Sequence, residues 1–429
     1  MNTFDVAIVG GGIAGLTSAV YLAQAGKSVV VLEKASKVGG RAQTTSKNGA
    51  LFNLGGHALY RGGAAEKILN ELQVNVSGAV PNTKGYAIWN GELFELPGSL
   101  AAMVKTKLLT WSGKTELVKV MLKLQTIYAT TIPHMSLREW AEKEIKDPMV
   151  RNVFYALCRT STYCIDYHQQ LASAVIQQVK LGLKGVLYVN NGWQSIVENL
   201  RLKALEAGAI ILTNKTVSSI QIGIQHQLYF ADGGRMAVSD VILTAGPDQS
   251  MKLINEAEGT LLQKWSQQAR PVYAACLDVA LKKLPRSSHH FAIGIDQHIL
   301  FSNHSRACSL SQDGEIVIQM IKYLGTKKEE SANVHKQELE SILDLMQPGW
   351  RKELVAQQFL PRMIVVQDTI SVQDKQYFGP GVPEIPGLYI AGDGTGHGEM
   401  LVDTAFASAK RAAEAIIKNE GLNRLQREA

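Results

Sequence analysis

The stretch of sequence that most constrains the fold is VAIVGGGIAGLTSAVYLAQAGKSVVVLEK, at residues 6–34. A short apolar run is followed by a cluster of glycines, a segment rich in small residues, and a second apolar run that ends on an acid. Because these apolar runs are continuous rather than alternating, they are typical of strands that are buried on both faces of a sheet. The order of strand, glycine turn, helix and strand predicts a βαβ unit in an α/β fold with a parallel sheet.

The glycine cluster fits the pattern G-x-G-x-x-G at Gly10, Gly12 and Gly15. In such a turn the first glycine allows a sharp change of direction, and the second lets a ligand phosphate approach the backbone. The third lets the helix pack closely on the strand. We expect a helix over residues 13–25, with its unpaired N–H groups and positive dipole end facing a diphosphate. The alternative is a glycine-rich turn that binds no ligand.

The second predicted strand, residues 28–32, places Glu33 at its C-terminal end. A carboxylate about 20 residues after the glycine turn can accept hydrogen bonds from the hydroxyl groups of a ribose. An acid at this place disfavours a 2′-phosphate, so the sequence indicates NAD or FAD as the ligand.

The composition describes a globular chain without features of a nucleic-acid-binding protein. Its 429 residues are enough for two or three domains, and 46% of them are hydrophobic while 19% are charged. The net charge of +6 is not gathered in a block of like charges, so we expect no nucleic-acid partner. The cysteines have the spacing of neither a zinc site nor a disulfide framework, so we expect free or buried thiols and no metal. They are Cys158, Cys164, Cys276 and Cys308.

The start of the chain and its hydropathy favour a cytoplasmic protein. The first predicted strand begins near Phe4, which leaves no room for a signal or transit peptide. We find no uncharged apolar stretch of about 18 residues, so we expect no transmembrane helix.

Segments with the βαβ texture alternate with segments of a different character, which predicts a domain that is interrupted twice. The Rossmann-like dinucleotide-binding domain would comprise residues 1–80, 188–247 and 350–429. The inserted α+β substrate domain would comprise residues 81–187 and 248–349. In its second part we expect strands over residues 272–281, 290–301 and 315–323, followed by a helix over residues 332–346.

With these segments in hand, the chain resembles the superfamily of FAD-dependent amine oxidases, protoporphyrinogen oxidases and phytoene desaturases. The matching pieces are GGGIAGL at 10–16, Glu33, VGGRAQT at 38–44, NLGGH at 53–57, KTVSSI at 215–220, SDVILTAGP at 239–247 and GLYIAGDGTG at 387–396. Residues 296–324 also resemble the corresponding stretch of phytoene-dehydrogenase-like proteins. The resemblance implies a Rossmann-like FAD-binding domain with an inserted substrate domain.

The resemblance also implies a role for each matching residue. The glycine turn would hold the FAD diphosphate, Glu33 the adenosine ribose, and Arg41 the diphosphate. Gly56 and His57 would run past the isoalloxazine ring. The helix that starts near Val402 would point its N-terminus at the pyrimidine carbonyls of the flavin. The implied cofactor-binding residues are Gly10, Gly11, Gly12, Ile13, Ala14, Gly15, Glu33, Lys34, Gly40, Arg41, Gly56, His57, Val217, Gly392, Asp393, Leu401 and Val402.

The chain departs from the amine oxidases of this superfamily in ways that favour an apolar substrate. An aromatic residue usually follows the C-terminal glycine loop there, whereas this chain has Glu399, Met400, Leu401 and Val402. We find no counterpart of the flavin-facing lysine and no cysteine suited to covalent attachment, so we expect non-covalent FAD. Asn53 replaces an acid of many relatives.

We therefore expect an FAD-dependent oxidoreductase of the dehydrogenase or desaturase type. It would move a hydride from an apolar, porphyrinogen-like or polyene-like substrate to N5 of the flavin, which then passes electrons to oxygen, a quinone or another acceptor. The alternatives are a flavin amine oxidase and a flavoprotein without net redox chemistry, such as an isomerase or a binding protein. No catalytic side chain is identified; His57 is a weak candidate for proton transfer, and Glu399 for substrate contact.

Residues 97–131 form the one segment with a pattern typical of peripheral membrane contact. Five lysines and one acid, Glu116, give it a local net charge of +4. The residues Leu117, Val120, Met121, Leu124 and Ile127 would share one helix face, with Lys119, Lys123 and Thr126 on the other side. The alternative is that the apolar face covers the substrate domain and that the lysines are solvated.

Overall fold

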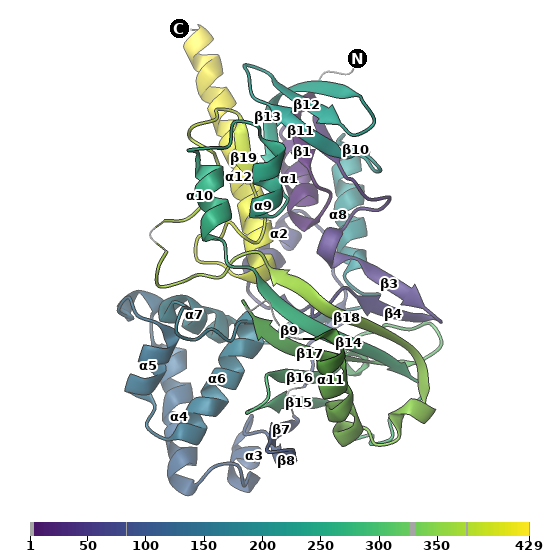
Figure 1. Cartoon of the computed structure of the whole chain (residues 1–429), viewed down its shortest axis with the longest axis vertical. Coiled ribbons are helices and arrows are strands. Elements are labelled where there is room, and N and C mark those ends of the chain that lie inside the picture. The colour runs from purple at the N-terminus through teal and green to yellow at the C-terminus, as the bar shows by residue number, and fades with distance from the viewer. Residues whose placement is uncertain (1–3, 83, 327–330, 375, 429) are drawn as a thin grey trace.

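The computed structural model describes residues 4–82, 84–326, 331–374 and 376–428. Figure 1 shows two regions, each built on a β-sheet, with both ends of the chain in the same region and the middle of the chain in the other. The expected α/β fold class is confirmed.

The first sheet has the strand order β10-β2-β1-β13-β12-β11, and β19 also pairs with β13. Its strands are β1 (Phe4–Val9), β2 (Val29–Leu32), β10 (Ile210–Leu212), β11 (Val217–Gln221), β12 (His226–Phe230), β13 (Arg235–Leu243) and β19 (Leu388–Ile390). The pairs among β10, β2, β1, β13 and β19 are parallel, whereas β11 and β12 are antiparallel. Along β1, Val6 and Ile8 pack in the core on one face, and Ala7 and Val9 in the core on the other. Burial on both faces explains the continuous apolar run.

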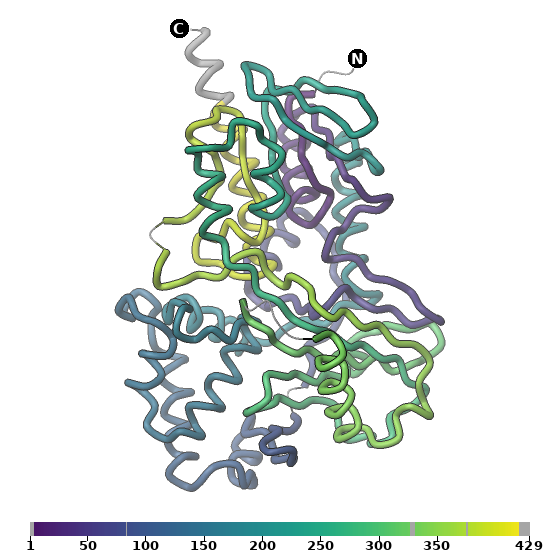
Figure 2. The backbone as a smooth tube through the Cα atoms, in the orientation of Figure 1, coloured from purple at the N-terminus to yellow at the C-terminus, as the bar shows by residue number. Residues whose placement is uncertain are grey.

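Helices pack on both faces of the first sheet. One face is covered by α1 (Ile13–Gln24), α2 (Ala64–Glu71), α8 (Gln194–Glu206) and α12 (Leu401–Glu428). The other face carries α9 (Pro247–Leu253) and α10 (Leu261–Gln268). In Figure 2 the purple N-terminal tube and the yellow C-terminal tube lie in the same region, in agreement with a hydrogen bond of 3.3 Å from Ser18 Oγ to the Ala409 carbonyl.

The second sheet has the strand order β18-β14-β17-β16-β15-β7-β8. Its strands are β7 (Tyr86–Trp89), β8 (Glu92–Glu95), β14 (Val272–Leu281), β15 (Phe291–Gly294), β16 (Ile299–Asn303), β17 (Ile316–Gly325) and β18 (Leu354–Val366). Along β14, Leu277 packs toward α11 (Ala332–Met346) on one face. Cys276 packs in the core on the opposite face, which the helices of the first insertion cover. These helices are α4 (Trp111–Thr126), α5 (Leu137–Glu144), α6 (Pro148–Thr162) and α7 (Ala172–Gly182), and they are preceded by α3 (Leu100–Lys105).

Short elements connect the two regions. The strands β3 (Thr44–Lys47) and β4 (Ala50–Asn53) form a hairpin, and β9 (Val186–Val189) pairs with β5 (Leu59–Tyr60) and with β6 (Gly78–Ala79). Single helical turns are η1 (Gly40–Ala42), η2 (Ala129–Thr131), η3 (His304–Arg306) and η4 (Trp350–Lys352).

The structure corrects three of the expected boundaries. Strand β18 pairs with β14 along its length, so residues 354–366 belong to the second sheet rather than to the dinucleotide-binding region. Helices α9 and α10 follow β13 directly and return to the first sheet, where Trp265 is buried, so they do not belong to the insertion. The continuous strand expected over residues 290–301 is instead the separate strands β15 and β16, because the chain reverses between them. Arg159 stabilises this reversal by donating hydrogen bonds to the carbonyls of Gly294 and Gln297.

Candidate functional site

A cavity of about 710 Å³ lies where the carboxyl ends of the first sheet meet the second region. It is lined by the residues that follow β1, β2, β13 and β19, which is the edge at which open α/β sheets bind ligands. Most of the residues singled out in the sequence line it. They are Gly10, Gly12, Ile13, Ala14, Glu33, Lys34, Gly40, Arg41, Gly56, His57, Val217, Gly392, Asp393, Leu401 and Val402.

The glycines of the first turn are required for different reasons. Gly10 has φ +111°, and a Cβ there would lie 2.5 Å from Thr244 Oγ1. A Cβ on Gly15 would lie 2.0 Å from the carbonyl oxygen of Gly10, so this glycine allows the close packing of α1 on β1 and does not line the cavity. Gly12 is different, because its φ of −77° suits any residue and a Cβ there would meet no protein atom within 4 Å.

Gly12 therefore leaves space for something outside the chain. It is the N-cap residue of α1, and no side chain caps the N–H groups of the first helical turn. These donors and the positive end of the helix dipole face the cavity at Gly12, Ile13 and Ala14. The arrangement fits a diphosphate, as the motif predicted.

Glu33 is buried at the end of β2, where backbone groups hold its carboxylate. Its Oε2 accepts a hydrogen bond of 2.8 Å from the Gly11 N–H, and its Oε1 accepts one of 2.8 Å from the Ala35 N–H. Gly11 thus orients Glu33, and it is not among the residues that line the cavity.

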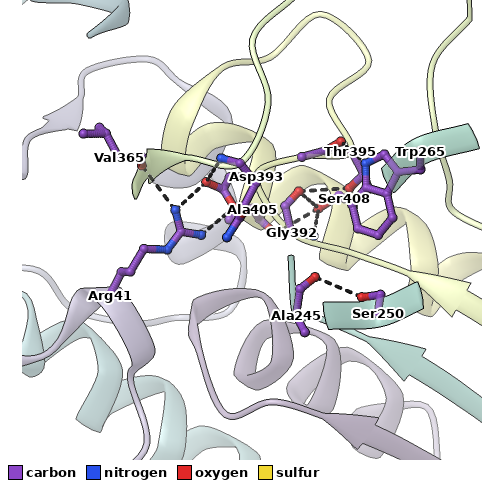
Figure 3. Close-up of polar contacts among 12 residues, drawn as sticks. Arg41, Ala245, Ser250, Trp265, Val365, Gly392, Asp393, Thr395, Ala405 and Ser408 are labelled. Carbon is purple, nitrogen blue, oxygen red and sulfur yellow. Dashed lines mark hydrogen bonds and ion pairs between the residues drawn. The ribbon is translucent and has the colours of Figure 1, made fainter. Parts of the chain in front are cut away.

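Arg41 and Asp393 form a bidentate ion pair across the cavity wall (Figure 3). The two guanidinium nitrogens lie 2.7 Å and 2.5 Å from the two carboxylate oxygens, and Nη1 also donates to the Val365 carbonyl at 3.2 Å. Asp393 Oδ2 accepts a further hydrogen bond of 3.0 Å from the Gln367 N–H. The sequence identified both residues as cofactor contacts but did not indicate that they pair with each other.

Side chains from separate elements hold the loop between β19 and α12 in place (Figure 3). Ser408 Oγ accepts a hydrogen bond of 2.9 Å from the Gly392 N–H, and the Trp265 indole donates one of 2.8 Å to the Gly394 carbonyl. Helix α12 begins at Leu401, whose φ is +58°, and the start of the helix lines the cavity with Leu401 and Val402. The N-terminus of α12 is thereby fixed at the cavity.

His57 lies in the cavity wall as a neutral hydrogen-bonding residue. Its Nδ1 is 2.9 Å from the Gly55 carbonyl, which makes Nδ1 the protonated nitrogen, and its ring lies 5.0 Å from that of Trp193. Burial lowers the pKa of His57 from 6.5 to about 4. At neutral pH the side chain is therefore uncharged.

Apolar and aromatic side chains make up part of the cavity lining. They are Ala58, Tyr60, Tyr163, Trp193, Met363, Val365 and Leu401. Charged residues line the same cavity, at the ends of the first-sheet strands and in the loops beside them. They are Glu33, Lys34, Arg41, Lys215, Lys252 and Asp393.

Several lining residues were not identified from the sequence. Thr244, Ala245 and Gly246 end the segment SDVILTAGP, which had been matched as a whole without a role for these positions. Tyr163 and Met363 reach the cavity from α6 and β18, and no local motif marks them. Glu399 does not line the cavity and pairs with Arg411 at 2.8 Å.

All four cysteines are free and buried. Among the described residues, no helix is long and apolar enough to cross a membrane. In the same part of the chain, no group of three or more His, Cys, Asp or Glu residues is arranged to hold a metal ion.

Comparisons with known proteins agree with the geometry of the cavity. The profile of the family described as FAD dependent oxidoreductase matches residues 5–415. A carotenoid 3,4-desaturase of Haloarcula japonica is 51% identical over 51 residues, and the match covers 12% of this chain and 10% of that protein.

Two solved structures share the fold. An oxidoreductase from Methanosarcina mazei has a TM-score of 0.77 and 19% identity, over 96% of this chain and 100% of that one. A putrescine oxidase bound to putrescine has a TM-score of 0.74 and 16% identity, over 97% of this chain and 99% of that one. These likenesses concern the fold.

Proposed function

The chain belongs to the family of FAD-dependent oxidoreductases, and from this premise we propose that it dehydrogenates an apolar substrate with FAD held non-covalently. The electrons would then pass to an acceptor such as oxygen or a quinone. The proposal concerns the substrate class, the residues that bind the cofactor and the mode of attachment.

The cavity offers a suitable partner for each part of the cofactor. The uncapped start of α1 at Gly12 suits the diphosphate, and the buried carboxylate of Glu33 suits the ribose hydroxyls. Val217, His57 and Leu401 line the cavity, where Val217 would contact the adenine and His57 and Leu401 the flavin. Gly12 supports this assignment most directly, because the conformation and surroundings of the chain alone would tolerate a side chain there.

Bound FAD would accept the hydride, and no amino-acid side chain can take over this role. The residues of this chain would orient the substrate and exclude water from the reacting carbon. His57, neutral and fixed by Gly55, would act as a hydrogen-bonding wall residue rather than as an acid.

The observation that supports the substrate class is the group of apolar and aromatic side chains in the cavity lining. The carboxylates among the described lining residues are Glu33, which accepts from backbone N–H groups, and Asp393, which pairs with Arg41. An ammonium group would therefore be desolvated in the cavity without a free partner of opposite charge. Met400 and Leu401 stand where the resemblance to amine oxidases implies an aromatic residue, and Met400 is buried. The partial match to a carotenoid 3,4-desaturase supports the same substrate class.

Amine oxidation is the competing function, because putrescine oxidase shares the fold. The test is anaerobic mixing of the FAD-loaded protein with a soluble polyene, a porphyrinogen and benzylamine, while the oxidised-flavin absorbance is followed. We expect bleaching by the polyene or the porphyrinogen and none by benzylamine. Rapid bleaching by benzylamine alone would contradict the proposed substrate class, and oxygen or quinone added afterwards would identify the acceptor.

A further inference from the structure

The first insertion carries a set of large apolar side chains that face solvent. Their exposed fractions range from 36% to 82%, and all of them lie on or beside α3 and α4. We call this set the α3–α4 face; it consists of Leu100, Val104, Trp111, Val118, Leu122 and Tyr128. Single exposed apolar residues are ordinary, whereas a group of this size marks a contact site.

Helix α4 has two apolar stripes, and the fold accounts for one of them. Leu117, Val120 and Leu124 are buried in the core of the insertion, so the stripe expected to contact a membrane covers the domain instead. Trp111, Val118 and Leu122 occupy positions i, i+7 and i+11, so they lie along the opposite side of the helix. Because a helix on a domain surface needs only one apolar stripe, the outer stripe indicates a second contact.

Helix α3 repeats this arrangement on a smaller scale. It has no buried residue, and its exposed residues Leu100 and Val104 lie one turn apart. In Figure 1, α3 and α4 lie at the end of the molecule opposite the chain termini, away from the first sheet. Their outer surface is thus far from the α1 and α12 elements that line the cavity.

The charges around the α3–α4 face are mainly positive. Lys105, Lys107 and Lys119 are exposed, and none of them has an ion-pair partner in the part of the chain that the structure describes. The carboxylate of Glu116, the acid of this segment, accepts hydrogen bonds of 2.7 Å and 2.8 Å from the backbone N–H groups of Lys146 and Asp147. The exposed acids closest along the chain are on β8, at Glu92 and Glu95.

We propose that the α3–α4 face lies on an anionic lipid surface. Trp and Tyr are the side chains best suited to the boundary between headgroups and acyl chains, and Lys can keep its charge in the headgroup layer while its stem stays apolar. A basic surface with protruding apolar side chains gains from acyl contact and from anionic headgroups together. This inference is independent of the substrate class proposed above, because it rests on residues outside the cavity.

The experiment is co-sedimentation of the FAD-loaded protein with vesicles of phosphatidylcholine, either alone or mixed with phosphatidylglycerol. One variant carries Trp111→Ser and Leu122→Ser, and another carries Lys105→Glu, Lys107→Glu and Lys119→Glu. Matched controls carry Ile224→Ser, an exposed apolar residue of the first region, and Lys264→Glu, Lys282→Glu and Lys418→Glu, which are exposed lysines elsewhere. Flavin absorbance and thermal midpoint confirm that each variant is folded.

We expect the wild type and both controls to sediment with the anionic vesicles at low salt, and less with neutral vesicles or at high salt. The lysine variant should bind about a hundredfold more weakly, and the apolar variant at least about tenfold more weakly. Binding of both variants as tight as the wild type would contradict the proposal. The proposal would also be contradicted if the wild type did not sediment with vesicles at any salt concentration. This holds even if the apolar side chains then prove to form a dimer interface, which the apolar variant would dissociate.

Discussion

Arg41 and Asp393 are 352 positions apart in the sequence, and their side chains meet in a bidentate ion pair of 2.7 Å and 2.5 Å at the wall of the cavity. The pair joins the turn after β2 to the loop before α12, so it holds the N-terminal and C-terminal parts of the site in one geometry. Its guanidinium side chain is 42% exposed and its carboxylate 8%, which leaves the cation available for a further anionic contact.

Arg41→Ala should weaken FAD binding without unfolding the chain. A charge-assisted hydrogen bond is worth about 1.5–3 kcal/mol, which corresponds to an affinity loss of roughly ten- to a hundredfold. Fluorescence titration of the apo-protein with FAD measures this change. The control is Arg138→Ala, which removes a surface ion pair with Glu142 and should leave FAD affinity unchanged. Equal FAD affinity in the wild type and Arg41→Ala would show that Arg41 does not contact the cofactor.

Gly12→Ala and Gly15→Ala should separate cofactor binding from folding. A Cβ on Gly12 meets no protein atom, so apo stability should be unchanged, while FAD affinity should fall by about tenfold or more because the methyl group occupies ligand space. A Cβ on Gly15 would clash with the Gly10 carbonyl, so that variant should lose about 3 kcal/mol of stability. Urea unfolding of the apo-proteins and FAD titration provide both measurements. If Gly12→Ala bound FAD normally, the diphosphate would not lie at the start of α1.

His57 should make the apo-protein less stable in acid. Burial lowers its pKa in the folded chain from 6.5 to about 4, so below pH 6.5 the unfolded chain binds a proton that the folded chain does not. Stability is therefore lost progressively as the pH falls from the unfolded value to the folded one. His57→Gln removes this contribution, and the difference in unfolding free energy between wild type and variant should change between about pH 7 and about pH 4.5. A constant difference across that range would show that the histidine titrates normally.

Asp278 should have the opposite effect, and make the protein less stable as the pH rises. Burial raises its pKa from 3.8 to about 8, and its Oδ1 has no hydrogen-bond partner. Because the folded pKa lies above the unfolded one, stability is lost as the pH rises from about 4 through about 8. Asp278→Asn cannot ionise and should gain roughly 2–4 kcal/mol relative to the wild type between about pH 5 and about pH 8. Parallel stability curves for the two proteins would contradict the assigned pKa.

The part of the site that the sequence predicted is the part that depends on local geometry. A turn such as Gly10 to Gly15 and an acid such as Glu33 at a strand end have fixed spacings, because one strand and one helix determine them. The strands of the first sheet were predicted for the same reason, since burial on both faces leaves a continuous apolar run.

The remaining part of the site depends on contacts between segments that are distant in the sequence. Such contacts produce no residue spacing that could be recognised in the sequence. Met363 and Tyr163 reach the cavity only because β18 pairs with β14 and α6 packs on the second sheet. The apolar pattern of β18 is equally compatible with either sheet, so its membership could not be assigned from composition. The outer stripe of α4 could not be predicted, because the buried stripe alone accounts for an amphipathic helix in this segment.

The most direct test of the account is a titration of the apo-protein with FAD, followed by denaturation and separation of the precipitated chain from the supernatant. We predict saturation at one FAD for each chain and full recovery of the flavin in the supernatant, which is the result that non-covalent binding in the cavity requires. Absence of saturable FAD binding, or colour that remains with the precipitate, would contradict the account.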